Sequence, residues 1–192
     1  MEYNVQKGEI YMNREMNNLD KFVYDFVKLL DGKYVLVSGY VSIITGRARA
    51  TEDVDLILPK MEFSYFSNLW GVFEENGFEC LNTSDVKEGF EMLEDHAIRF
   101  ARKGKPIPNM EFKVVKDELG MYSLNHRVKL FIRDKMFFVS TIEMQIAYKR
   151  YYLGSPKDME DALHLEELFK EKIDYKKLKE LKDLVMRVKE NE

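Results

Sequence analysis

The chain has 192 residues, of which 45% are hydrophobic, 13% are aromatic and 33% are charged. This length and apolar content suit one compact domain with a real core, and they exclude a disordered chain. Ten glycines and four prolines exclude a collagen-like or linker-like composition. The net charge of −4 argues against a protein that coats duplex DNA non-specifically, although a local basic patch is compatible with it.

Three further features bear on cellular location. The longest uncharged stretch, residues 34–46, is too short to span a bilayer. The first ten residues include charged groups and no apolar run, so we expect no signal peptide. The single cysteine, Cys80, excludes an intrachain disulfide and a cysteine-built zinc site. These features predict a cytoplasmic protein with no membrane partner.

The first two thirds of the chain alternate predicted helices and strands. Apolar residues at three- and four-residue steps predict a helix over 19–30. A continuous apolar run predicts a buried strand over 34–37, followed by a short helix over 39–45 and a second strand over 53–58. The pattern then predicts a helix over 63–75, a strand over 78–81, a helix over 85–93, strands over 96–102 and 110–115, and a hairpin of 128–132 with 136–139.

The last third of the chain has the pattern of helices. Ser140 with Glu143, and Ser155 with Asp158, have the spacing of capping boxes, and Gly154 between them is suited to end a helix. A final amphipathic helix is predicted over 174–188. We therefore expect a single domain over 1–192, with an α/β core over 33–140 and a helical C-terminal region over 141–192 packed on it.

Two aspartates on the second predicted strand are the first candidates for chemistry. Asp53 and Asp55 are two residues apart, so they point to the same face of the strand. Two like charges side by side are unfavourable unless a cation or a proton lies between them. Oxygen ligands of this kind suit Mg²⁺ or Mn²⁺. The alternative is that both carboxylates simply line the solvated face of an edge strand.

The turn before the short helix suggests anion binding. Gly39 follows a buried strand, and a glycine there lets backbone amides approach an anion closely. Ser38 adds a hydroxyl beside it, and the basic residues Arg47 and Arg49 lie between this turn and Asp53. This order of turn, helix, basic residues and paired carboxylates is suited to binding a phosphorylated ligand together with a metal ion.

The segment from Val37 to Asp55, and in particular the run GRARATEDVDLIL, resembles the signature of the nucleotidyltransferase superfamily, which has the polymerase-beta-like fold. There a Gly-Gly or Gly-Ser turn precedes a short helix and an Asp-x-Asp strand. The sequence is most similar to small prokaryotic members that include AbiEii-type abortive-infection toxins of toxin–antitoxin systems. The resemblance is specific over 34–58 and weaker over 110–161. It implies an α/β (α+β) fold with a mixed sheet flanked by helices.

The resemblance also implies a reaction, which is transfer of a nucleoside monophosphate from a nucleoside triphosphate such as ATP to an acceptor hydroxyl by a two-metal mechanism. The catalytic and metal-binding residues would be Asp53, Asp55 and Glu111, with Mg²⁺ or Mn²⁺ as cofactor. The nucleotide-binding residues would be Ser38, Gly39, Arg49, Lys149 and Asp158. The alternative for Glu111 is an ordinary exposed strand glutamate, and that for Asp158 is its role in the capping box.

Lys149 is notable because it interrupts an apolar helical stripe of Ile142, Ile146 and Leu153. A lysine on such a face either extends to water or meets a carboxylate or a phosphate. Asp161 is expected to pair with Lys157 one turn earlier on the next helix.

Tyr40 departs from the family pattern, because the family has a glycine or a serine at the position after the first glycine. We expect its ring to crowd the phosphates and weaken nucleotide affinity. This leaves open a catalytically degenerate relative that acts as a nucleotide- or partner-binding module, or a plain interaction protein with surface carboxylates. The acceptor is open among RNA, a protein and a small molecule, as is a partner protein or a homo-oligomer.

Overall fold

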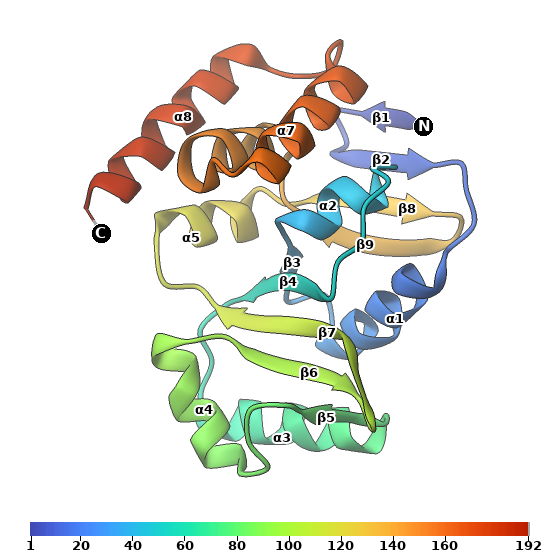
Figure 1. Cartoon of the computed structure of the whole chain (residues 1–192), viewed down its shortest axis with the longest axis vertical. Coiled ribbons are helices and arrows are strands. Elements are labelled where there is room, and N and C mark those ends of the chain that lie inside the picture. The colour runs from blue at the N-terminus through green and yellow to red at the C-terminus, as the bar shows by residue number, and fades with distance from the viewer. Residues whose placement is uncertain (192) are drawn as a thin grey trace.

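The computed structural model describes residues 1–191, and a mixed sheet of nine strands forms its centre (Figure 1). The strands are Glu2–Asn4 (β1), Glu9–Met12 (β2), Val35–Leu36 (β3), Asp53–Leu58 (β4), Phe78–Cys80 (β5), Ile98–Arg102 (β6), Lys105–Val114 (β7), Val128–Ile132 (β8) and Lys135–Val139 (β9). From edge to edge they run in the order β1-β2-β8-β9-β3-β4-β7-β6-β5. The predicted α/β fold with a mixed sheet flanked by helices is confirmed.

Helices cover the sheet and form most of the C-terminal third. They are Asn18–Val27 (α1), Lys28–Leu30 (η1), Gly39–Ile44 (α2), Phe63–Glu75 (α3), Val86–Asp95 (α4), Glu118–Asn125 (α5), Ile142–Ala147 (α6), Tyr148–Leu153 (η2), Pro156–Phe169 (α7) and Tyr175–Glu190 (α8). In Figure 1, α3 and α4 lie beside the β5–β6 edge, whereas α7 and α8 lie at the opposite end of the molecule. Within residues 1–191, none of the helices combines the length and the apolar character needed to span a bilayer.

The strand β4 lies in the interior of the sheet, where it pairs with β3 in the antiparallel sense and with β7 in the parallel sense. Its side chains alternate between the two faces, as the period of a strand requires. Val54, Leu56 and Leu58 are buried in the core, together with Met110 and Phe112 of β7. The opposite face of the same two strands carries the acidic residues, so the register that builds the core also places the candidate site.

The sequence pattern missed β1, β2 and α5, which are short elements at one edge of the sheet and after β7. It also misplaced the start of α6, because Thr141 rather than Ser140 is the N-cap and accepts from the Met144 amide. Glu143 is buried and accepts a hydrogen bond from the backbone amide of Asp174. The predicted N-cap of α7 is confirmed, since the hydroxyl of Ser155 accepts from the Asp158 amide, and the Asp158 carboxylate bonds to that hydroxyl instead of the Ser155 amide.

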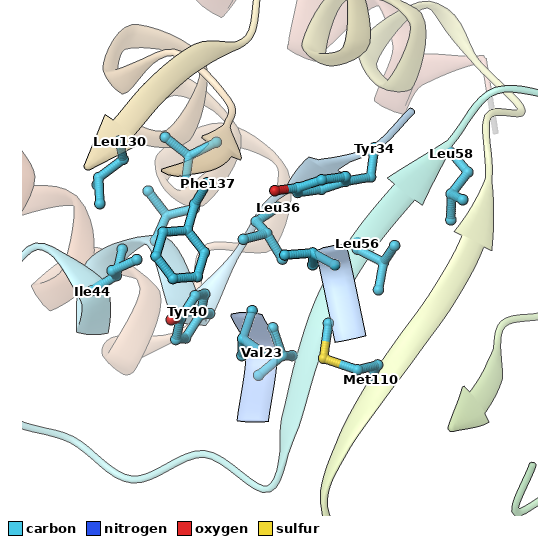
Figure 2. Close-up of a cluster of buried hydrophobic side chains, with 14 of the residues drawn as sticks. Val23, Tyr34, Leu36, Tyr40, Ile44, Leu56, Leu58, Met110, Leu130 and Phe137 are labelled. Atoms are coloured by element: carbon cyan, nitrogen blue, oxygen red, sulfur yellow. The ribbon is translucent and has the colours of Figure 1, made fainter. Parts of the chain in front are cut away.

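Tyr40 points into the protein and away from the turn that precedes α2. Figure 2 shows its ring in the buried cluster with Val23 and Phe137. Its hydroxyl donates to Oδ1 of Asp20 at 2.9 Å, and both residues have no exposed surface. Asp20 is in turn held by Arg14. The prediction that Tyr40 crowds the phosphates is therefore wrong, because α2 directs this side chain onto α1.

Replacing Tyr40 is thus expected to change stability and not nucleotide affinity. Tyr40→Phe removes one donor to a buried carboxylate and should cost about 2 kcal/mol of unfolding free energy. Tyr40→Ser also leaves a cavity and should cost about 3 kcal/mol or more. Urea unfolding of the two variants measures both values. A Tyr40→Ser protein as stable as the wild type, with tighter triphosphate binding, would restore the crowding interpretation.

Candidate active site

Asp55 and Glu111 lie next to each other because the parallel register of β4 and β7 makes them direct partners. Both side chains are largely buried, with exposed fractions of 18% and 16%. Asp53 lies on the same face of β4, at its first residue, and is exposed. Its carboxylate accepts a hydrogen bond from the hydroxyl of Thr51 at 3.2 Å. The structure therefore brings Asp55 and Glu111 together and places Asp53 at the rim.

Lys113 lies between these two carboxylates. Its Nζ is 2.5 Å from Oδ1 of Asp55 and 2.6 Å from Oε2 of Glu111. Arg99 of β6 contributes a second cation, with Nη2 3.1 Å from Oε1 of Glu111. The carboxylate pair is therefore neutralised by the chain's own cations.

The protonation behaviour of this cluster follows from its burial and its charges. Burial raises the pKa of Asp55, and the neighbouring Glu111 carboxylate adds to this rise. Burial also acts to raise the pKa of Glu111, but hydrogen bonds from Asp55 and Lys113 and the charges of Lys113 and Arg99 outweigh it, and that pKa is lowered to about 2. Burial opposes the charge of Lys113, yet the two carboxylates raise its pKa. The titration of each of these groups therefore depends on the charge of the other two.

The acidic side chains of the site suit a divalent cation in their chemistry. Two of them, Asp55 and Glu111, also suit it in their position. Across residues 1–191, no three acidic, histidine or cysteine side chains stand close enough together to hold one metal ion. However, Asp55 and Glu111 converge on a single position that an ammonium group already fills. Carboxylate oxygens around one cation position are the donor set of Mg²⁺ or Mn²⁺.

The turn beside this pair consists of Ser38 and Gly39. The Val37 amide donates to the carbonyl of Asp55 at 3.1 Å, which keeps the turn next to the carboxylates. Ser38 has φ 60° and ψ −134°, a conformation that favours glycine and costs about 1–3 kcal/mol in other residues. The position that calls for glycine is therefore Ser38, and Tyr40 lies one residue beyond the two-residue turn.

Arg49 explains why residue 39 is a glycine. A Cβ at this position would lie 2.5 Å from Nη2 of Arg49, so the guanidinium packs directly on the backbone of Gly39. The other end of the guanidinium is held by Asp161, whose Oδ2 is 2.8 Å from Nη1. Arg49 is thus fixed as a positive charge at the turn.

Asp161 is the centre of a buried ionic cluster that the sequence pattern missed. It has no exposed surface, and it accepts from Arg49, from Nε of Arg47 at 3.1 Å and from Nζ of Lys149 at 2.9 Å. The predicted pairing of Asp161 with Lys157 is wrong, because the cations that reach it come from the loop before β4 and from η2. The cluster joins the C-terminal helices to the turn region.

Lys149 is fully buried and points to carboxylates, not to solvent. Asp158 is its second partner, with Oδ1 3.9 Å from Nζ. The segment η2 is a π-helix, and the Gly154 amide reaches back to the carbonyl of Lys149 across its wider turn. The predicted apolar stripe is broken there, since Leu153 is exposed. Contact of Lys149 or Asp158 with a nucleotide stays a prediction.

A cavity of about 360 Å³ opens beside Asp55. Ser38, Asp55 and Lys113 line it on the sheet side. Met144, Gln145 and Tyr148 line it from α6 and η2. Its volume lies within the range of small-molecule sites. This arrangement is suited to a small ligand that lies between the sheet and the helices.

Two residues of the site, Lys113 and Asp161, have sequence signals that place them near it, although the sequence pattern did not assign them to the site. Lys113 alternates onto the same strand face as Glu111, so its proximity to the carboxylates follows from the period of two. Asp161 follows Asp158 at the three-residue spacing of one helix face. Its pairing with two arginines more than a hundred residues earlier had no local signal.

The buried position of Lys149 predicts a stability effect. Lys149→Met removes one of three cations from a carboxylate with no exposed surface, and breaking such a pair costs about 3 kcal/mol or more. Lys157→Met, an exposed lysine on α7, is the matched control and should change stability by less than about 0.5 kcal/mol. Chemical denaturation compares the two variants. Equal stability of Lys149→Met and the wild type would contradict the buried cluster.

Comparison with known proteins bears on the fold. No protein-family model matches the sequence, and a comparison with curated proteins finds no match. Among solved structures, the chain is similar to ANT(2'')-Ia in a crystal structure with adenylyl-2''-tobramycin, with 12% identity and a TM-score of 0.55 over 86% of this chain and 95% of that chain. A solution structure of the antibiotic-resistance factor ANT(2'')-Ia gives 13% identity and a TM-score of 0.55, over 85% and 89% of the two chains.

A third similar structure is an antigenic nucleotidyltransferase-like protein from Paracoccidioides brasiliensis, with 18% identity and a TM-score of 0.49 over 85% of this chain and 88% of that chain. The conclusion on the fold rests on the first two. Together with the order of strand, turn, short helix and Asp-x-Asp strand, they show that this chain shares the fold of ANT(2'')-Ia.

Proposed function

We propose that the protein is a metal-dependent nucleotidyltransferase that moves a nucleoside monophosphate from a nucleoside triphosphate to an acceptor hydroxyl. The observation that carries the proposal is the paired arrangement of Asp55 and Glu111 around one cation position, beside a turn and a cavity. The fold of ANT(2'')-Ia supports it, since that protein is solved in complex with adenylyl-2''-tobramycin.

The three carboxylates have the metal-binding role in this proposal. Asp55 and Glu111 would hold Mg²⁺ or Mn²⁺ directly, and Asp53, at the rim of the same face of β4, would turn toward the ion to complete the ligand set. The metal, when bound, neutralises triphosphate charge and lowers the pKa of the acceptor hydroxyl. The carboxylates also orient the ligand, because they lie on two hydrogen-bonded strands that cannot move independently.

The turn and Arg49 bind the phosphates. Ser38 lines the cavity next to Asp55, and its hydroxyl would donate to the phosphate oxygens. The guanidinium of Arg49, packed on Gly39, neutralises charge as it develops on the leaving phosphates. Lys149 acts one step further back, because it holds Asp161, which holds Arg49. Asp158 in turn pairs with Lys149. The nucleoside lies in the cavity under Tyr148.

The surroundings of the cavity favour an anionic acceptor. A second hollow, of about 490 Å³, adjoins the cavity through shared residues at the end of β7. Lys33, Lys60, Lys116 and Arg127 line it, against one carboxylate, Asp117. Such a concentration of cations in a chain with a net charge of −4 favours a phosphorylated acceptor such as RNA. Protein and small-molecule acceptors are the other arms of the test, and the toxin role stays a prediction.

One observation favours a second candidate, a catalytically degenerate module that binds a nucleotide or a partner. It is the ammonium of Lys113, which occupies the position between the two carboxylates. Such a module binds the triphosphate and releases no pyrophosphate.

The deciding experiment follows label from each of four α-labelled nucleoside triphosphates into total RNA, protein or small-molecule extract with Mg²⁺, and measures pyrophosphate in parallel. We expect metal-dependent transfer by the wild type. Asp55→Asn and Glu111→Gln should each lower the rate at least a hundredfold, since even outer-shell partners of a metal are worth about 10–100-fold.

Glu52→Gln is the matched control, because Glu52 is an exposed acid directly before Asp53. It should retain the wild-type rate. Binding of a triphosphate without pyrophosphate release would favour the degenerate module. No binding of any triphosphate would contradict both candidates.

A further inference from the structure

Lys113 is the one lysine that contacts the candidate metal ligands among residues 1–191. It forms ion pairs with both Asp55 and Glu111, while its side chain is 37% exposed and lines the cavity beside them. A lysine that only stabilised the fold could pair with a single carboxylate. Lys113 instead pairs with both of the carboxylates that the proposed function assigns to the metal. The same position cannot hold an ammonium group and a divalent cation together, because like charges at this distance repel strongly.

We propose that Lys113 is a resident counter-cation that competes with the divalent metal for Asp55 and Glu111, and that it is released into the nucleotide cavity when the metal binds. This inference rests on the metal site of the proposed function. It adds that the metal-free site is already charge-neutral, so metal affinity is set by an exchange of cations and not by simple filling of the site.

The neighbouring groups make this exchange feasible. Arg99 stays on the other oxygen of Glu111, so that carboxylate keeps its orientation when Lys113 leaves. Lys113 follows Glu111 on the same face of β7. Its flexible side chain allows the ammonium to move while the strand remains paired with β4. The released ammonium lies at the wall of the cavity that holds the phosphates, where it replaces its carboxylate partners with anionic oxygens.

The exchange predicts that removing the ammonium tightens metal binding. Isothermal titration of Mn²⁺ into the nucleotide-free full chain measures the affinity directly. Lys113→Met should bind Mn²⁺ about tenfold more tightly than the wild type, which corresponds to ~1.4 kcal/mol. Lys113→Gln should also bind Mn²⁺ more tightly than the wild type. It replaces Lys113→Met in the comparison if the methionine variant does not fold.

Two variants separate direct competition from a general change in charge. Lys116→Met removes an equal charge from the same cavity wall but from an exposed lysine with no contact to Asp55 or Glu111, so its affinity should stay within about twofold of wild type. Lys113→Arg keeps a cation in place and should also remain near wild type.

The outcomes distinguish this inference from the proposed function. Equal Mn²⁺ affinity of the wild type and both charge-removing Lys113 variants overturns the competition and leaves the metal site standing. An equal gain in Mn²⁺ affinity in Lys116→Met also overturns it. The gain would then come from the loss of a nearby positive charge and not from the loss of direct competition for the two carboxylates. Absence of Mn²⁺ binding in every variant overturns the competition and the proposed metal site together.

Discussion

The parallel pairing of β4 with β7 is the constraint on which the rest of this structure depends. It joins the two halves of the sheet, and its register makes Asp55 the direct partner of Glu111. The same alternation that buries Leu56 and Phe112 on one face forces the two carboxylates together on the other. Like charges in this arrangement are unfavourable without a cation, so the fold creates a demand for positive charge that Lys113 meets in the protein alone.

A second buried ionic cluster, centred on Asp161, links the C-terminal helices to the turn before α2. Asp161 is completely buried on α7, and it is stable there only because Lys149, Arg47 and Arg49 surround it. Arg49 is thereby placed against the backbone of Gly39, beside the strained turn residue Ser38. The helical region therefore does more than cover the sheet, because it holds the cation that the proposed phosphate site uses.

Local patterns in the sequence predicted the parts of the fold that depend on local rules. The periods of helix and strand gave β4, α3 and the β8–β9 hairpin with their approximate bounds, and Asp53, Asp55 and Glu111 fall on the predicted strand faces. What failed depended on distant partners. Tyr40 turned inward because a buried Asp20 on α1 offers its hydroxyl a partner, and Asp161 took arginines from the loop before β4 instead of Lys157. No pattern within a few residues encodes such pairings.

The central claim is that Asp55 and Glu111 hold a metal ion that serves a triphosphate in the adjoining cavity. The most direct measurement is a crystal structure of the protein with Mg²⁺ and a non-hydrolysable nucleoside triphosphate. We expect Mg²⁺ at the two carboxylates, Asp53 turned toward it, the phosphates next to Ser38, and the Lys113 ammonium displaced from both carboxylates. A bound triphosphate at another surface, with Lys113 still bridging Asp55 and Glu111, would contradict it.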